Sequence, residues 1–349
     1  MSTFRGTVQC GHFMYMNEEY LNYCRRAYQQ ILAADNILIV SHLHPDIDAL
    51  SSVGIMIELV EGLNKNYLAY AQDKDDNIFD FLPHAERVHS KLPLGFSFND
   101  YDLVLILDCG AINRTGLAEA LHNRNKSKIQ VIEFDHHPPV DHFADLEIRL
   151  PHLASTTEVL YHFLKINNIA INKNLSNLLL SGILADTGNF LYPSTSEDTI
   201  NIASEMLQSG AQLPKIFQNT LQNKNLTSMR LWGLALKNLK VNSKYNLAVS
   251  VLTQEEINEA TQAVGLDEAS NDIFGDIVGF LSNLGGVKGV ILFREESDGK
   301  IKASLRTSDP AIDISRLAAI FGGGGHAKAS GLVVKGKINS SNDGWEFEY

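Results

Sequence analysis

Cysteine is scarce in this sequence, with three residues in 349, Cys10, Cys24 and Cys109. They form neither a Cys-x-x-Cys pair nor an even set, which argues against structural zinc and against a disulfide-stapled secreted scaffold. A chain of this length buries enough apolar surface to fold without covalent cross-links. The cysteine content fits a reducing environment, and we therefore expect a cytoplasmic protein.

Long apolar runs and an excess of positive charge are also missing. No stretch of about 18 apolar residues occurs, and Met1 to Tyr20 lacks the apolar core of a signal peptide, so we expect no membrane insertion. Lys and Arg number 29 against 41 Asp and Glu, and the net charge of −12 repels long duplex nucleic acid. A phosphorylated substrate must therefore be held locally, by a metal ion, by backbone N–H groups or by one or two arginines.

The composition is that of a globular protein, with 44% apolar and 20% charged residues, and the length predicts two domains of about 150 residues each. In the first half, short β-branched runs alternate with helical patterns, which is typical of a doubly wound α/β domain with a parallel sheet. The expected strands are Ile37 to Ser41, Tyr67 to Ala71, Leu103 to Leu107 and Val131 to Phe134. The expected helices are Asn17 to Leu32, Asp48 to Leu63, Thr156 to Lys165 and Leu175 to Leu184.

The pattern changes after Tyr192. Helical stretches without a strand follow at Thr199 to Ser209, Leu213 to Thr220 and Leu226 to Leu239. Strands then return at Leu247 to Leu252, Val287 to Phe293, Ile301 to Leu305 and Leu332 to Val334, with helices at Glu255 to Ala263 and Asp272 to Leu284. We predict a doubly wound domain over residues 1–192, a helical linker over 193–240 and a smaller mixed α/β domain over 241–349. The tail Asn339 to Tyr349 is expected to be loosely attached.

Acidic residues and histidines follow apolar runs at four places. They are His42, Asp46 and Asp48 after one strand, Asp108 after another, Asp135, His136 and His137 after a third, and Asp186 at the end of an apolar helix. Parallel strands present their carboxyl ends at one edge of a sheet, so these side chains are expected to meet there. Carboxylates about 4 Å apart repel by about 4 kcal/mol per pair at an effective dielectric of 20, which calls for a bound cation.

Carboxylates mixed with imidazoles, without thiolates, suit Mn²⁺, Mg²⁺ or Fe²⁺ better than structural Zn²⁺. Six or so ligands suffice for two ions that share bridging aspartates, an arrangement that activates water and clamps a phosphoryl group. Each fragment alone has a plainer interpretation, as a helix N-cap for Asp46 or Asp48 and as an ordinary loop acid for Asp108. The four clusters together favour a metal centre.

The motif His-x-x-Pro-Asp-x-Asp at His42 to Asp48, followed in order by Asp108, Asp135-His136-His137 and Asp186-Thr187-Gly188, resembles the DHH phosphoesterase family. The C-terminal part has Ser304-Leu305-Arg306, then Gly322 to His326, then Ala329-Ser330-Gly331. This set resembles the DHH-associated C-terminal domain of the branch that contains nanoRNases and pAp phosphatases. The resemblance covers essentially the whole chain, and it implies an active site in the cleft between the two domains.

The resemblance implies two divalent cations, with Mn²⁺ as the expected ion and Mg²⁺ or Fe²⁺ as alternatives. The first ion would be held by His42, Asp46, Asp108 and Asp186, and the second by Asp48, Asp108, His136 and Asp186. Asp135 would fix an imidazole tautomer, and His137 would face the substrate phosphate as a donor or proton shuttle, which makes both candidate catalytic residues. His44 has no assigned role.

Two further segments have both plain and functional interpretations. Arg114 could reach the phosphate, although a surface arginine is the plainer interpretation. The segment Ser155-Thr156-Thr157-Glu158 resembles a further family motif, and its simplest role is to start a helix, with Ser155 as the N-cap and Glu158 completing a capping box.

The glycine run provides the candidate substrate-binding residues of the C-terminal domain. Gly323, Gly324 and Gly325 can place backbone N–H groups around an anion, and His326 can add a donor. The plain alternative is a flexible turn between a helix and a strand. Arg306 is a suitable bidentate partner for a phosphate, and Ser304 lies on the same strand. A dinucleotide-binding fingerprint is excluded because the run lies near the end of the chain.

Together with these features, the resemblance implies a metal-dependent hydrolase of short oligoribonucleotides or of 3′-phosphoadenosine 5′-phosphate. The alternatives are hydrolysis of linear dinucleotides such as pApA, hydrolysis of cyclic dinucleotides or of polyphosphate, and a catalytically inactive nucleotide-sensing module. The acidic surface argues against a processive exonuclease and against binding of long duplexes. We expect the protein to bind a short RNA or a nucleotide and not to bind a membrane. A homodimer is compatible with the sequence.

Overall fold

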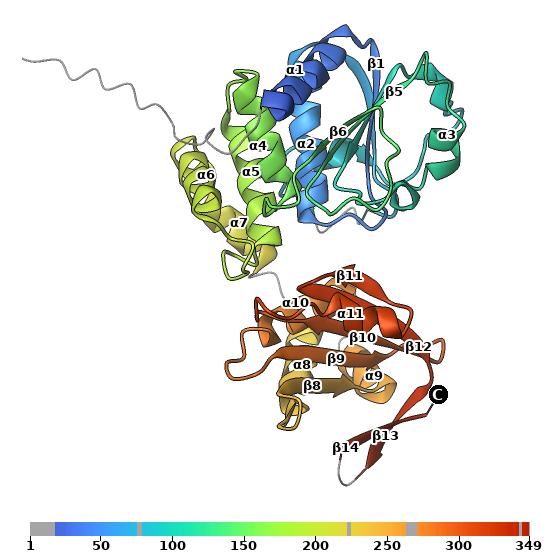
Figure 1. Ribbon diagram of the computed structural model, residues 1–349, viewed down its shortest axis with the longest axis vertical. Helices are drawn as coiled ribbons and strands as arrows, with labels where there is room; N and C mark the ends of the chain where they lie inside the picture. The colour runs from blue at the N-terminus through green and yellow to red at the C-terminus, as the bar shows by residue number, and fades with distance from the viewer. Residues whose placement is uncertain (1–17, 75–78, 222–224, 263–270, 342–343, 349) are drawn as a thin grey trace, which may run out of the picture. The chain divides into compact units, whose positions relative to one another are not determined.

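The computed structural model describes residues 18–74, 79–221, 225–262, 271–341 and 344–348. The chain divides into two compact units, Met1–Gln222 (unit 1) and Asn223–Tyr349 (unit 2), each built around its own sheet (Figure 1). Within the described ranges, no helix is both long and apolar enough to cross a membrane.

The sheet of unit 1 has six strands in the order β3-β2-β1-β4-β5-β6, and every neighbouring pair is parallel. The strands are β1 (Asn36–Ser41), β2 (Asn66–Tyr70), β3 (Val88–His89), β4 (Leu103–Leu107), β5 (Gln130–Asp135) and β6 (Leu146–Arg149). The central strands are apolar on both faces, because helices or loops cover each face of a parallel sheet.

Successive residues of β1 show how the two faces are covered. Ile37 and Ile39 pack in the core beneath the long helices, whereas Leu38 and Val40 pack in the core of the opposite face. The long helices are α1 (Glu18–Ala33), α2 (Ile47–Gly62), α4 (Thr156–Ile166) and α5 (Lys173–Asp186), with α6 (Glu197–Gln208) and α7 (Leu213–Thr220) packed against α5. The opposite face carries α3 (Ala118–His122) (Figure 1). The 3₁₀ turns Phe98–Asp100 and Ile112–Thr115 pack in the core of that face, whereas Ala85 of the turn Ala85–Arg87 packs in the core beneath the long helices.

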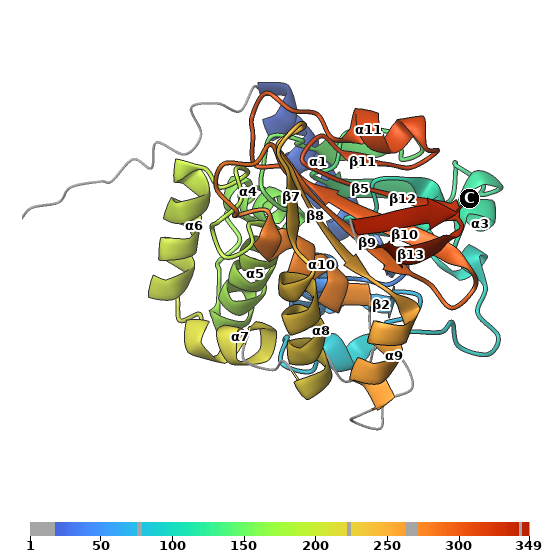
Figure 2. The ribbon, with the colours of Figure 1, turned by 90° about the horizontal axis from the view of Figure 1, so that it is seen from below.

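Unit 2 contains a mixed sheet in the order β11-β12-β10-β9-β8-β7, in which only the pair β8 and β9 is parallel among the described strands. Its strands are β7 (Lys240–Asn242), β8 (Leu247–Leu252), β9 (Gly289–Glu295), β10 (Lys300–Arg306), β11 (Gly324–His326) and β12 (Ala329–Lys335). Helices α8 (Leu226–Lys237), α9 (Gln254–Gln262) and α10 (Asn271–Leu281) pack on one face, and α11 (Ser315–Ile320) packs on the other (Figure 2).

The predicted fold class is confirmed: a parallel N-terminal sheet, a helical middle and a mixed C-terminal sheet. The helical middle does not form a body of its own, since α6 and α7 belong to unit 1 and α8 belongs to unit 2.

The prediction of a loose C-terminal tail was wrong. β13 (Lys337–Ser341) and β14 (Gly344–Glu348) form an antiparallel hairpin. Ile338 and Trp345 pack with Val251 and Ile301 in a small apolar cluster, and the ammonium group of Lys240 lies 4.5 Å from the centre of the Trp345 ring. This packing of the hairpin against unit 2 holds the tail in place.

Candidate metal centre

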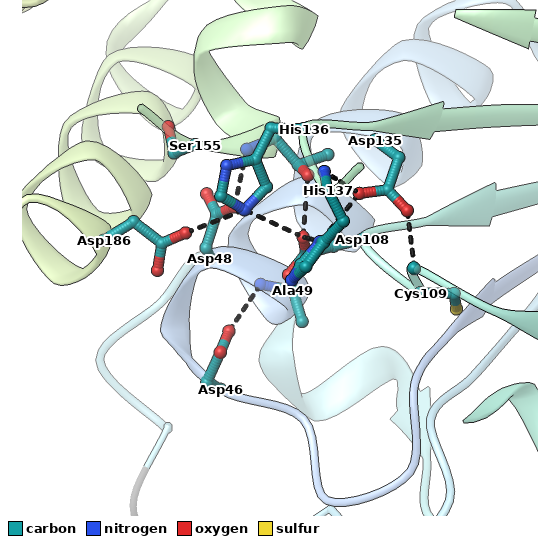
Figure 3. A network of polar contacts seen from close by, with 12 residues as sticks. Asp46, Asp48, Ala49, Asp108, Cys109, Asp135, His136, His137, Ser155 and Asp186 are labelled. Atoms are coloured by element: carbon teal, nitrogen blue, oxygen red, sulfur yellow. Dashed lines mark hydrogen bonds and ion pairs between the residues drawn. The ribbon is translucent and has the colours of Figure 1, made fainter. Parts of the chain in front are cut away.

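The ends of three adjacent strands bring most of the predicted ligands together. β1, β4 and β5 are parallel neighbours, and they lead directly into His42, Asp108 and the pair His136 and His137. Asp186, the last residue of α5, reaches the same place from a helix (Figure 3). Ligand atoms of these residues form three groups, in each of which all atoms lie within 4.8 Å of one another.

The first group consists of His42, Asp46 and Asp108. Nε2 of His42 lies 3.9 Å from Oδ2 of Asp46 and 3.8 Å from Oδ2 of Asp108. The Nδ1 atom of His42 is 2.8 Å from the carbonyl of Leu43, which can only accept, so Nδ1 carries the proton. The lone pair of a neutral His42 is therefore on Nε2 and faces the two carboxylates, as a metal ligand requires.

The second group consists of Asp48, His136 and Asp186. Nε2 of His136 is 3.2 Å from Oδ2 of Asp186 and 3.6 Å from Oδ1 of Asp108 (Figure 3). The third group consists of Asp108, His136 and His137, so Asp108 belongs to the first group and the third. Asp186 lies with Asp48 and His136, and not in the group of His42 and Asp46.

Asp46 has both of the roles that its sequence context allows. It is the N-cap of α2, where Oδ1 accepts a hydrogen bond from the backbone N–H of Ala49 at 3.0 Å (Figure 3). Its other oxygen, Oδ2, faces His42. Capping is therefore compatible with metal ligation at this residue.

Burial and mutual repulsion perturb the carboxyl groups. Burial and the neighbouring charges of Asp186 and Asp108 raise the pKa of Asp48 well above its usual value. Burial raises the pKa of Asp186 to about 6, although its hydrogen bond with His136 acts in the opposite direction. Burial also opposes ionisation of Asp108, but a hydrogen bond from His137 and the charge of His136 hold its pKa below the usual range. Such crowding of carboxylates fits bound cations, which would supply the missing positive charge.

Asp135 lies behind the ligands and not among them. Its Oδ1 accepts hydrogen bonds from the backbone N–H of His137 at 2.7 Å and from Nδ1 of His137 at 2.8 Å, and its Oδ2 accepts from the backbone N–H of Gly110 at 2.6 Å. These bonds fix the orientation of the His137 ring. The rings of His136 and His137 meet edge to face, with their centres 4.5 Å apart.

The first turn of α4 contributes donors that we did not predict. The backbone N–H groups of Thr156 and Thr157 donate to Asp48 at 2.7 and 3.1 Å, and the Thr156 hydroxyl donates to Oδ1 of Asp108 at 2.7 Å. The N-terminal end of a helix favours negative charge, so α4 stabilises the ionised form of Asp48. The available signal was the pair of hydroxyl residues directly after Ser155.

Ser155 is the N-cap of α4, as predicted, and accepts from the backbone N–H of Glu158 at 3.1 Å. The predicted capping box differs in one bond, because the Glu158 carboxylate accepts from Ala154 at 2.9 Å instead of from the N-cap residue. Two side-chain hydrogen bonds therefore still attach the segment before α4 to the first turn of the helix.

The structure also locates Arg114 and His44. Nη1 of Arg114 donates to the carbonyl of Cys109 at 3.2 Å. A Cβ added to Gly110 would lie 3.4 Å from Nη1 of Arg114 and 3.5 Å from Cγ of His137. Arg114 is therefore close to the centre. His44 is exposed, and its Nε2 is 3.9 Å from a carboxylate oxygen of Asp73.

In unit 2, strand pairing relates the predicted substrate-binding residues. Arg306 on β10 pairs with Ala329 on β12, and Ala329 pairs with His326 on β11. Ser304 pairs with Gly331, which in turn pairs with Gly324. Arg306 and His326 thus share one cross-strand row, with backbones roughly 10 Å apart. The side chain of His326 lies outside the described part of the structure.

The glycine run forms a turn and then strand β11, and two of its glycines are needed for close packing. A Cβ on Gly323 would overlap the carbonyl of Gly331, and one on Gly325, whose φ is +135°, would lie 2.6 Å from the carbonyl of Ala329. At Gly324 the corresponding space is open. Packing therefore explains Gly323 and Gly325, whereas Gly324 keeps an accessible backbone.

Comparisons with known proteins cover both units. Residues 36–183 match the DHH family, N-terminal domain, and residues 245–342 match the DHHA1 domain. The chain is 28% identical over 303 residues to the bifunctional oligoribonuclease and PAP phosphatase NrnA of Bacillus subtilis, which covers 86% of this chain and 90% of the relative. It is 27% identical over 305 residues to the protein of the same name from Thermus thermophilus, with 86% and 84% covered.

Two solved structures are also similar. An exopolyphosphatase-related protein from Bacteroides fragilis superposes with a TM-score of 0.78 at 26% identity, over 89% of this chain and 90% of that chain. RecJ of Thermus thermophilus in complex with Mn²⁺ superposes with a TM-score of 0.51 at 14% identity, over 91% of this chain and 52% of RecJ. The RecJ comparison supports the fold alone.

Proposed function

The chain belongs to the DHH family of metal-dependent phosphoesterases, with a DHHA1 domain after its DHH domain, and on that premise we propose that it hydrolyses short oligoribonucleotides and 3′-phosphoadenosine 5′-phosphate. The observation that carries the proposal is the meeting of seven side chains in three groups of ligand atoms. They are His42, Asp46, Asp48, Asp108, His136, His137 and Asp186.

The donor set fits two divalent cations, of which Mn²⁺ is the one we propose. His42, Asp46 and Asp108 would hold one ion, with Asp186 as a further ligand implied by the family resemblance. Asp48, His136 and Asp186 would hold the other, with Asp108 shared. Two such ions, when bound, would lower the pKa of a water molecule and neutralise charge on a phosphoryl group.

The protein side chains orient and protonate the reacting groups. Asp135 and Gly110 fix the loop that carries His137, and the Nδ1–H of His137 is held by Asp135. Burial opposes protonation of His137, but hydrogen bonds to Asp108 and Asp135 raise its pKa to about 9. We assign His137 as the donor to the substrate phosphate or the leaving oxygen.

Substrate choice is assigned to unit 2. Arg306 would bind a phosphate or ribose group away from the reacting phosphate, and the open backbone at Gly324 would approach the same ligand. The names of the two similar NrnA proteins support nucleotide substrates, and the net charge of −12 supports short ones.

Polyphosphate is the second candidate substrate, because the similar Bacteroides fragilis structure is described as exopolyphosphatase-related. Linear dinucleotides such as pApA, and cyclic dinucleotides, are further candidates, because they contain phosphodiester bonds as short oligoribonucleotides do. A catalytically inactive nucleotide sensor is the alternative without chemistry, and the complete ligand set argues against it.

A substrate panel tests the proposal. The purified chain with Mn²⁺ should release phosphate from 3′-phosphoadenosine 5′-phosphate and mononucleotides from RNAs of two to five nucleotides, and EDTA should abolish both activities. Faster turnover of polyphosphate than of any nucleotide would favour the second candidate. Binding of nucleotides without hydrolysis under all metal conditions would favour the sensor.

A further inference from the structure

We propose that Arg149 is a positioning residue that holds Asp135 and the loop of His137 in the geometry the centre needs. Arg149 is the last residue of β6, and its side chain is only 6% exposed. This burial favours contacts with protein groups over contacts with substrate. The effect on catalysis rests on the proposed function, whereas the effect on the His137 ring does not.

The guanidinium group of Arg149 contacts the loop at several points. Its Nη1 atom donates to the carbonyls of His137 at 3.2 Å, Pro138 at 3.4 Å and Gly110 at 3.5 Å. The same atom lies 3.7 Å from Oδ2 of Asp135. One nitrogen thus touches both segments that Asp135 links, the turn after β4 and the turn after β5.

Glu133 holds the other end of the guanidinium group. Its Oε2 accepts from Nη2 of Arg149 at 2.6 Å, and the carboxylate is fully buried. Burial and the nearby Asp135 raise the pKa of Glu133 to about 7, although the charge of Arg149 lowers it. A continuous series of polar contacts therefore ends at the metal centre. It runs from Glu133 through Arg149 and Asp135 to the His137 ring.

The buried ion pair of Arg149 and Glu133 contributes little to the stability of the sheet. Nε of Arg149 and Oε1 of Glu133 are buried without a hydrogen-bond partner among the described residues. Replacing a buried ion pair with apolar residues is often neutral or stabilising. Stability alone therefore gives no reason for this pair, whereas a role in positioning does.

Arg124 provides a matched control within the same unit. It is also a buried arginine, with Nη2 2.9 Å from Oδ2 of Asp145 and bonds to the carbonyls of Leu121 and Phe143. None of these partners belongs to the metal centre. Arg124→Met and Arg149→Met should each destabilise unit 1, so a difference between them isolates positioning.

The first test is a spectroscopic one that needs neither metal nor substrate. In metal-free protein labelled with ¹⁵N-histidine, the Nδ1–H of His137 should give a slowly exchanging downfield signal, identified by its loss in His137→Gln. We expect Arg124→Met to keep this signal and Arg149→Met to shift or lose it. An unchanged signal in folded Arg149→Met would overturn the proposal, whatever the protein hydrolyses.

The second test is kinetic. At a temperature where both variants are folded, Arg149→Met should lower kcat by about 10- to 100-fold with little change in KM, the range found for groups behind metal ligands. Arg124→Met should leave kcat within twofold of the wild type. Arg149→Lys keeps the positive charge but loses the planar guanidinium group with its several donors. Its kcat should therefore lie between those of Arg149→Met and the wild type. Equal kcat values for the Arg149→Met and Arg124→Met variants would show a merely structural role.

Discussion

Oδ1 of Asp48 accepts two hydrogen bonds from Thr157, one from the backbone N–H at 3.1 Å and one from the hydroxyl at 2.7 Å. This pair lies directly against α5 at Gly182, where a Cβ would overlap both Oδ1 of Asp48 and the Thr157 hydroxyl. The absence of a side chain at residue 182 is therefore part of the geometry of the metal centre.

Gly182→Ala should reduce activity while improving the intrinsic preference of α5 for a helix. Alanine is favoured over glycine in a helix by about 1 kcal/mol, but here its Cβ must displace Asp48. We expect about a 10- to 100-fold loss of kcat or Mn²⁺ affinity, measured by kinetics and calorimetry. Gly233→Ala in α8 is the control and should leave activity unchanged, because among the described residues nothing beyond its own helix backbone and chain neighbours lies within 4 Å of the added Cβ. Unchanged activity in Gly182→Ala would contradict the packing argument.

Asp108→Asn should abolish tight binding of both cations. Asp108 has a φ of +58°, a conformation that asparagine tolerates better than alanine does, so this change removes charge with little backbone strain. We expect kcat to fall by more than about 1,000-fold, because Asp108 is shared between the two proposed ion sites, whereas Arg114→Ala should cost less than about tenfold. Metal content and kcat measure the effect, and similar losses in the two variants would refute the ligand assignment.

Arg306→Ala should weaken nucleotide binding far more than the hydrolysis of a small ester. A lost charged hydrogen bond costs about 1.5 to 3 kcal/mol, and remote binding energy used to orient the phosphate would lower kcat as well. Turnover of bis-(p-nitrophenyl) phosphate should stay near that of the wild type while cleavage of 3′-phosphoadenosine 5′-phosphate falls. Equal losses on both substrates would mean that Arg306 acts at the metal centre or stabilises the folded structure.

Unit 1 should lose stability in alkali because of Cys24. Burial raises the pKa of this thiol from its usual 9.0 to about 12, although a hydrogen bond with Tyr20 acts in the opposite direction. Above pH 9 the unfolded chain therefore releases a proton that the folded chain keeps, so the free energy of unfolding falls as the pH rises towards 12. Urea titrations from pH 8 to 11 should show a steeper fall for the wild type than for Cys24→Ala. Parallel curves would mean that Cys24 ionises equally in both states.

The sequence was informative wherever one short segment carried the signal. Apolar runs ending in His42, Asp108 and Asp135 predicted both the parallel strands and the edge at which their side chains gather. Helix α7 and strands β4 and β8 have the predicted bounds. These features depend on local periodicity, which is preserved in a single stretch of chain.

Features that depend on contacts between distant segments were missed. Nothing near Arg149 in the sequence indicates that it pairs with Glu133, because strand register decides which side chains meet. The same holds for Gly182, whose role comes from the packing of Asp48 against α5. The tail from Asn339 to Tyr349 was predicted to be loosely attached, yet Trp345 packs with residues far away in the chain, Val251 and Ile301.

The candidate metal ligands come from four separate chain segments, beginning with His42 and ending with Asp186 at the last turn of α5. The group of His42, Asp46 and Asp108 needs only the ends of β1 and β4 and the start of α2, whereas the group of Asp48, His136 and Asp186 cannot form until α5 has been made and docked. Binding of a cation by this second group should therefore be a late event in folding, and uptake of a second Mn²⁺ should report that α5 has docked in unit 1.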